Sequence, residues 1–231
     1  MCQIVRSQNP IDGRCVLQCM NGEVVVLVHG LARTPLSLLA LAMSARARGY
    51  DVVHWHYRST RVTIAEAAES FARKKLSRLA SATRVHFVTH SLGGIVVRQL
   101  LSHHSLANLG RVVMLAPPNG GSEVADVLQR CDVLARIVSP LRELGTNEAS
   151  VPRALPPADF DLGVIAGSRS HIPLFDRWME RVPNDGVVAV NRTRVDGMRD
   201  FLVLHRTHTT LPWSPDAIHA AFDFLERGTF H

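Results

Sequence analysis

The sequence lacks any stretch of about 18 apolar, uncharged residues, the minimum for a membrane-spanning helix. Residues 1–9 also lack the basic segment followed by an apolar segment that is typical of a secretory signal. We therefore expect a cytoplasmic protein without an integral membrane segment. With 231 residues, 46% of them hydrophobic, the chain is long enough for one large core, and we expect residues 1–231 to form a single domain.

Cysteine is scarce, and its spacing resembles neither a disulfide framework nor a zinc site. The four cysteines are Cys2, Cys15, Cys19 and Cys131. We expect free thiols, which fits a reducing compartment. Two histidine pairs have no third ligand at a suitable spacing, namely His54 with His56 and His103 with His104. The sequence therefore predicts neither a metal site nor a cofactor.

Lysine is nearly absent: of the 26 lysine and arginine residues, two are lysines, Lys74 and Lys75. The net charge is +6 and the isoelectric point is near 9.8, but the arginines are spread along the chain. Nucleic-acid-binding surfaces usually cluster their basic residues. We therefore do not expect a nucleic-acid partner, and the oligomeric state stays open.

Apolar strand-like runs alternate with longer helix-like segments, a pattern typical of an α/β fold with a parallel sheet covered on both faces. Six strands are expected, at residues 23–29, 50–56, 84–88, 110–116, 161–166 and 201–204. Helices are expected at residues 35–49, 63–79 and 93–102, with a final helix that begins after Ser214 and ends near Arg227. The expected architecture is one doubly wound sheet of mainly parallel strands.

The segment VHFVTHSLGGIVV, residues 85–97, reads as a strand, a tight turn and a helix in direct succession. This is the context of a nucleophile elbow, in which a serine projects from a sharp turn at the end of a strand. Gly93 and Gly94 provide the small neighbours that such a turn needs, although Thr89 stands where the G-x-S-x-G pattern has its first glycine. We interpret Ser91 as a catalytic nucleophile.

Six segments together resemble small bacterial α/β-hydrolases of the esterase and lipase type. They are VVLVHGLAR, VTHSLGG, PPNGGSEVAD, GVIAG, NDGVVAV and THTTLPWS, and they cover nearly the whole chain after residue 22. The layout is similar to that of minimal lipases, which lack the first strands of the full fold and a large lid. The resemblance implies an α/β-hydrolase fold and a catalytic triad in the order serine, acid, histidine.

In that family the oxyanion hole is made by the backbone N–H groups of the residue after the nucleophile and of a residue in the loop after an early strand. The matching positions here are Leu92 and Leu31. The acid is expected at Asp185, within a D-G-x-V segment, with Asp196 and Asp200 as alternatives.

For the base, His208 lies in the loop between the last strand and the last helix, and the rival His205 lies at the end of that strand. The resemblance favours His208. In this mechanism His208 accepts the proton of Ser91, and Asp185 orients the imidazole and stabilises its charged form.

The segment after the fourth strand carries apolar residues at helical spacing between residues 120 and 145, interrupted near Pro140. Two readings are equally weighted: a helix packed on the sheet, or residues 120–157 as a small cap over Ser91.

The resemblance implies a carboxylester hydrolase acting on a small-molecule ester or lipid. The same triad would also serve a thioesterase or an acyltransferase, and a non-catalytic protein of this fold is a further alternative, because fold alone does not fix function.

Overall fold

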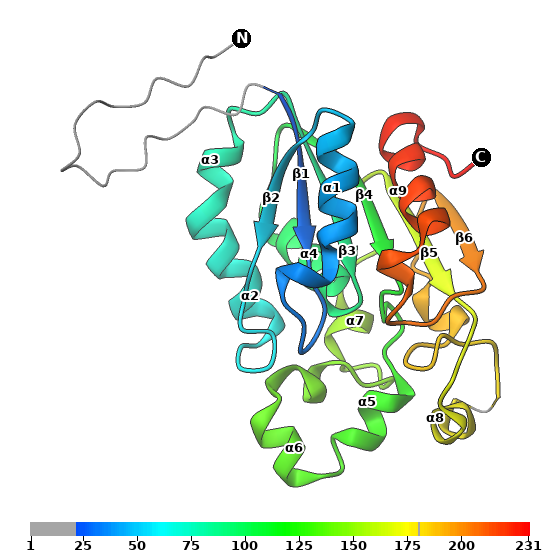
Figure 1. Cartoon of the computed structure of the whole chain (residues 1–231). Helices are drawn as coiled ribbons and strands as arrows, with labels where there is room; N and C mark the ends of the chain where they lie inside the picture. Colours follow the sequence, from blue (N-terminus) through cyan, green and yellow to red (C-terminus); the bar gives the residue numbers. More distant parts are fainter. Residues whose placement is uncertain (1–21, 180) are drawn as a thin grey trace, which may run out of the picture.

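The computed structural model describes residues 22–179 and 181–231, which contain a six-stranded sheet with helices on both faces (Figure 1). The strand order is β2-β1-β3-β4-β5-β6, and every neighbouring pair is parallel. The strands are β1 (Glu23–Val28), β2 (Asp51–Trp55), β3 (Arg84–His90), β4 (Leu109–Leu115), β5 (Leu162–Gly167) and β6 (Asp200–Leu204). The six expected strands and the α/β class are confirmed.

The helices also follow the expected pattern. They are α1 (Leu39–Ala47), α2 (Ile64–Phe71), α3 (Ser77–Leu79), α4 (Leu92–His103), α5 (Glu123–Leu128), α6 (Asp132–Ile137), α7 (Val151–Ala154), α8 (Pro173–Trp178) and α9 (Pro215–Arg227). Short 3-10 or π turns are η1 (Pro35–Leu38), η2 (Ala72–Leu76), η3 (Ser139–Glu143), η4 (Val190–Thr193) and η5 (Leu211–Trp213). The first helix stops at Gly49, whose φ of 85° suits a glycine after a helix end.

The two faces of the sheet explain the nearly continuous apolar strands. In β1, Val25 and Leu27 join a core with α1 and α9, whereas Val24, Val26 and Val28 join a core with α2 and α4. Because side chains alternate along a strand, a strand covered on both faces must be apolar at every position. The helices cover the two faces of the sheet. The carboxyl ends of the parallel strands therefore lie together at one edge, and the loops that follow the strands gather there.

The segment between β4 and β5 differs from the single apolar stripe expected at residues 120–145. The chain is broken into α5, α6 and η3, and Pro140 starts the η3 turn together with Ser139. Leu141 and Leu144 are buried, but Val133 and Ile137 on α6 are 64% and 62% exposed. The expected continuous stripe is wrong, because α5 ends before Cys131 and α6 turns apolar residues toward solvent.

Cys131 is exposed, and the other three cysteines lie outside the described residues.

Arg98, a buried arginine on α4, connects this segment to the body of the fold. Its Nη1 donates to Asn119 Oδ1 at 3.1 Å and to the Pro152 carbonyl oxygen at 3.0 Å. Its Nη2 donates to the carbonyl oxygens of Leu155 at 3.2 Å and Pro156 at 3.0 Å. Burial lowers the pKa of Arg98 to about 10, and the guanidinium still carries its charge at neutral pH. One side chain therefore holds two loops near the carboxyl edge of the sheet.

We expect Arg98→Met to lower the free energy of unfolding by about 3 kcal/mol or more, because four acceptors lose a charged donor inside the fold. Urea unfolding followed by circular dichroism measures this. The matched control is Arg153→Met, since Arg153 is exposed and forms a surface ion pair with Glu148; its effect is expected to stay within about 0.5 kcal/mol. Equal losses in the two variants would contradict the role given to Arg98.

Candidate active site

Ser91 lies in the sharp turn between β3 and α4. Its backbone has φ 53° and ψ −126°, a region that a residue with a side chain rarely adopts and that stores roughly 1–3 kcal/mol of strain. The Ser91 N–H donates to the Leu115 carbonyl oxygen at 2.8 Å, which anchors the turn to β4. The side chain is 9% exposed and reaches a pocket. The turn therefore presents one hydroxyl at the carboxyl edge of the sheet.

Gly93 and Gly94 let α4 approach the sheet behind this turn. A Cβ at Gly93 would lie 2.5 Å from the Val28 carbonyl oxygen, too close for any real Cβ. At Gly94 it would lie 3.1 Å from both Met114 Sδ and Pro117 Cβ. The paired glycines noted in the sequence are thus required by close contacts with the neighbouring strands.

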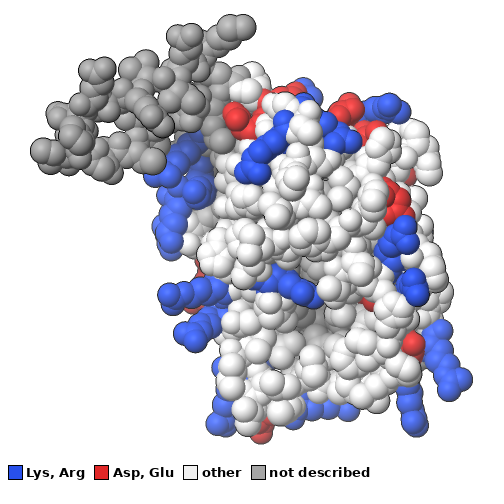
Figure 2. Space-filling view, in the orientation of Figure 1, with Lys and Arg blue, Asp and Glu red and all other residues white. Residues whose placement is uncertain are grey.

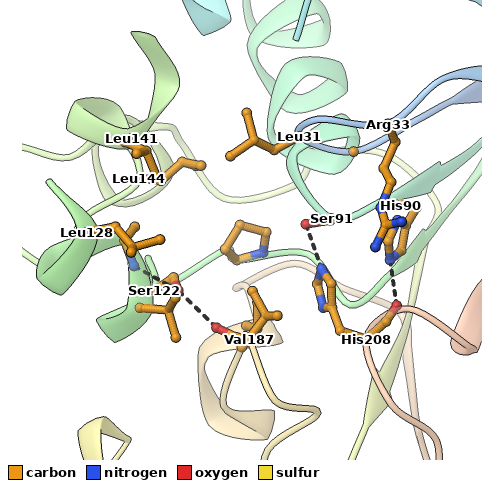
Figure 3. Close-up of a pocket in the computed structure, with 15 residues that line it drawn as sticks. Leu31, Arg33, His90, Ser91, Ser122, Leu128, Leu141, Leu144, Val187 and His208 are labelled. Atoms are coloured by element: carbon orange, nitrogen blue, oxygen red, sulfur yellow. Dashed lines mark hydrogen bonds between the residues drawn. The ribbon is translucent and has the colours of Figure 1, made fainter. Parts of the chain in front are cut away.

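The side chains of Ser91, His208 and Asp185 form a hydrogen-bonded row. His208 Nε2 lies 2.9 Å from Ser91 Oγ, and His208 Nδ1 lies 2.7 Å from Asp185 Oδ2 (Figure 3 draws the first contact). An ionised carboxylate only accepts hydrogen bonds, so Nδ1 carries the proton and Nε2 presents its lone pair to the serine hydroxyl. The loop after β6 supplies the histidine, and the loop between α8 and η4 supplies the aspartate.

Asp185 is 2% exposed and is held by its own turn. Its Oδ1 accepts hydrogen bonds from the N–H groups of Val187 at 3.0 Å and Val188 at 2.8 Å, which leaves Oδ2 for His208. The Asp185 carbonyl oxygen also accepts from the His208 N–H at 2.9 Å. Gly167, at the end of β5, provides the room, because a Cβ there would lie 2.8 Å from Asp185 Cβ.

The alternative acids and the alternative base lie elsewhere. Asp200 Oδ2 accepts from the Phe230 N–H at 2.6 Å, so it fixes the C-terminal segment. Asp196 lies on a separate surface hollow with Arg98 and Pro152. His205 is exposed and lines a separate surface hollow together with Trp213 and Pro215. None of these three side chains takes part in the hydrogen-bonded row at Ser91.

The loop after β1 places Leu31 on the wall of the same pocket as Ser91. Gly30 permits this approach, since a Cβ there would lie 3.0 Å from Ser91 Cβ. Ser59 Oγ accepts the Ala32 N–H at 3.1 Å, and the Tyr57 hydroxyl donates to the His29 carbonyl oxygen at 2.9 Å. Leu92 is the first residue of α4, where a helix leaves N–H groups without helical partners.

Tyr57 and Ser59 had no signal in the sequence, because they follow β2 and meet the loop after β1 only through the parallel pairing of β1 and β2. The site thus includes two side chains that hold the loop without touching Ser91.

His90, the residue before Ser91, is a further neighbour that the sequence reasoning missed. Its Nε2 donates to the His208 carbonyl oxygen at 2.9 Å, and the two imidazole rings lie 4.8 Å apart (Figure 3). Complete burial, with His208 nearby, holds the pKa of His90 well below its ordinary value, so the ring stays neutral. The only possible sequence signal was its place beside the serine. His90 fixes the backbone of the loop that carries His208.

A pocket of about 200 Å³ opens beside Ser91. Most of its wall is apolar, and the apolar side chains are Leu31, Pro118, Val124, Ala125, Leu128, Leu141, Leu144, Val187 and Val188. Figure 3 shows the cluster of leucines on one side of Ser91, with Arg33, His90 and His208 on the other. Apolar walls with a few convergent polar groups are typical of small-molecule sites.

Two features are absent from residues 22–179 and 181–231. This part of the chain contains no group of three or more His, Cys, Asp or Glu side chains arranged to hold a metal ion. No helix in these residues combines the length and the apolar character required to cross a membrane.

Comparison with protein families gives one match, because a family model described as a domain of unknown function (DUF7379) matches residues 5–157. No curated protein matches the chain.

Solved structures match over most of the chain. The mature form of the Bacillus licheniformis lipase BlEst2 is 19% identical, with a TM-score of 0.65, over 89% of this chain and 91% of that one. The metagenomic carboxyl esterase MGS0156 is 20% identical, with a TM-score of 0.65, over 84% of this chain and 66% of that one. The phospholipase PlaB from Legionella pneumophila is 21% identical, with a TM-score of 0.56, over 74% of this chain and 45% of that one. At these identities the likeness establishes a shared fold.

Proposed function

Because the chain belongs to the family described as a domain of unknown function (DUF7379) and has the α/β-hydrolase fold, we propose that it is a serine hydrolase that cleaves carboxylic esters. The observation that carries the proposal is the hydrogen-bonded row of Ser91, His208 and Asp185. A serine hydroxyl is a weak nucleophile by itself and needs an adjacent base that a third group orients. The named lipases and esterases of the same fold support ester substrates.

In the proposed reaction, His208 Nε2 takes the proton from Ser91 Oγ while Oγ attacks the ester carbonyl carbon. The negative charge that forms on the carbonyl oxygen is stabilised by the N–H groups of Leu31 and Leu92. The bond from carbon to the alcohol oxygen then breaks, and His208 gives its proton to the leaving alcohol. Water repeats the sequence on the acyl-serine and releases the acid. Asp185 holds the imidazole in the required tautomer and balances its charge.

The pocket supports a short acyl chain as the group that Ser91 receives. Its volume of about 200 Å³ is below the roughly 300–1,000 Å³ of pockets that enclose drug-sized ligands. Val124 and Leu128 of α5, with Leu141 of η3, supply one wall. We therefore propose that residues 120–157 act as a small cap over Ser91, and that the leucines of this cap cover the acyl chain.

The test is covalent labelling by a fluorophosphonate, a probe that reacts with an activated serine. We expect one label per chain, mapped by mass spectrometry to Ser91. Among residues 22–179 and 181–231, it is the one serine whose hydroxyl is hydrogen-bonded to a histidine that is itself hydrogen-bonded to an aspartate. Heat-denatured protein is the control and should not react. A butyrate ester in excess should slow the labelling. Failure of the folded protein to react, or a label on another serine, would contradict the proposal.

A further inference from the structure

Arg33 is the one permanently charged side chain on the wall of the Ser91 pocket in the part of the chain that the structure describes. Its side chain is exposed at the mouth, and its Nη2 donates to Thr209 Oγ1 at 3.1 Å. No carboxylate among residues 22–179 and 181–231 forms an ion pair with it. The proposed reaction gives this guanidinium no role, and the other described residues of the pocket wall include no carboxylate that would pair with it.

The position of Arg33 relative to His208 indicates which end of a substrate it would meet. In the proposed reaction His208 protonates the leaving alcohol, so the alcohol part of the ester must pass beside His208. Thr209, the residue that Arg33 contacts, directly follows His208. The leucines lie on the opposite side of Ser91 from Arg33 (Figure 3). An ester bound with its acyl chain among the leucines therefore directs its alcohol part toward Arg33.

We propose that the substrates are esters whose alcohol part carries an anionic group, a carboxylate or a phosphate, that Arg33 binds; this inference rests on the proposed hydrolase function. A guanidinium offers a planar fork of N–H donors that matches either group with two parallel hydrogen bonds. The hydrogen bond to Thr209 already orients the fork at the mouth, so less side-chain freedom is lost on binding.

The charge around the site points the same way. No Asp or Glu side chain lines the described wall of the pocket, so nothing there repels an anion. The chain carries a net charge of +6, and basic side chains are more prominent than acidic ones on the lower half of the face in Figure 2. A positive surface raises the local concentration of anionic substrates.

The test compares four butyrate esters that share the acyl chain and differ at the far end of the alcohol: 2-methoxyethyl butyrate, 3-butyryloxypropanoate, 2-butyryloxyethyl phosphate and butyrylcholine. Their hydrolysis is followed by alkali uptake at constant pH. We expect kcat/KM to be about tenfold higher for at least one anionic ester than for the methoxyethyl ester, and lowest for the cation. The faster of the two anions identifies whether a carboxylate or a phosphate is preferred.

Arg33→Gln should bring the ratio of anionic to neutral kcat/KM close to one, and Arg33→Glu should reverse it. The matched control is Arg84→Gln, which removes the same charge at the start of β3, at the opposite edge of the sheet, and should leave the ratio unchanged. Added salt should lower the wild-type preference, because an exposed charge is screened. Equal rates for all four esters, or an equal change of ratio in Arg84→Gln, would overturn the assignment to Arg33. If no ester is hydrolysed and the fluorophosphonate does not react, the hydrolase function itself fails.

Discussion

Ser91→Ala is expected to lower kcat for ester hydrolysis by on the order of 10⁶-fold while the fold stays intact. The substitution removes the attacking oxygen, and water is then the only nucleophile left in the site. Stability should change by about 1 kcal/mol or less, since alanine also has a Cβ and must adopt the same φ of 53°. The loss is confined to one hydrogen bond with His208.

The measurement is the rate of butyrate ester hydrolysis by the purified variant, together with urea unfolding of the same sample. Ser102→Ala is the matched control, because Ser102 lies near the end of α4, the helix that follows Ser91, and is exposed. Among the described residues its hydroxyl hydrogen-bonds to its near neighbours Gln99 and His103. It should keep the wild-type rate. If Ser91→Ala turned over esters at the wild-type rate, the nucleophile would have to be another group.

The sheet could be predicted from the sequence because its strands are buried on both faces. Successive residues of β1 pack alternately against the helices on one face and on the other, so Val24 to Val28 had to be apolar throughout. Such an apolar run is visible in the sequence. The turn at Ser91 was equally readable, since Gly93 meets a backbone atom at a distance that only glycine tolerates. Both features depend on steric demands at single positions or within short segments, so they can be read from the residues of those segments.

The structure of the segment between β4 and β5 and the supporting hydrogen bonds could not be predicted in the same way. Arg98 bonds to acceptors that lie between 21 and 58 residues away, and Ser59 meets Ala32 across 27 residues, so neither pair is adjacent in the sequence. In the segment between residues 120 and 145, Leu134 and Ile137 fit the helical spacing of apolar residues, yet they are 39% and 62% exposed. The spacing of apolar residues alone did not distinguish buried from exposed helix positions.

The meeting of Ser91, His208 and Asp185 was expected from chain order and loop position. Parallel strands place their carboxyl ends at one edge, so loops after β3, β5 and β6 converge even though their residues are far apart in the chain. The choice of Asp185 over Asp196 rested on the resemblance of the D-G-x-V segment. The hydrogen-bonding distances agree with that choice, and the catalytic roles stay predictions for kinetics to test.

Asp185→Asn is expected to lower kcat by about 10⁴-fold, and His208→Ala by up to about 10⁶-fold. The geometry of the Asp185 turn explains the first value. Oδ1 accepts from the N–H groups of Val187 and Val188, so an asparagine must keep its oxygen there and turn its NH₂ toward His208 Nδ1. An NH₂ donor selects the tautomer that is protonated on Nε2, and that imidazole is unable to accept the proton of Ser91.

The combination of these changes with Ser91→Ala separates a joint mechanism from independent effects. If the three groups act as a unit, removal of Ser91 already abolishes their joint contribution to the rate. The double variant Ser91→Ala with His208→Ala should therefore be no slower than Ser91→Ala alone. His205→Ala and Asp196→Asn are the matched controls, because both residues lie away from the hydrogen-bonded row and should keep most of the activity. Multiplicative losses in the double variant would mean that His208 contributes without Ser91. Inactivation by His205→Ala with His208→Ala still active would move the base to the other histidine.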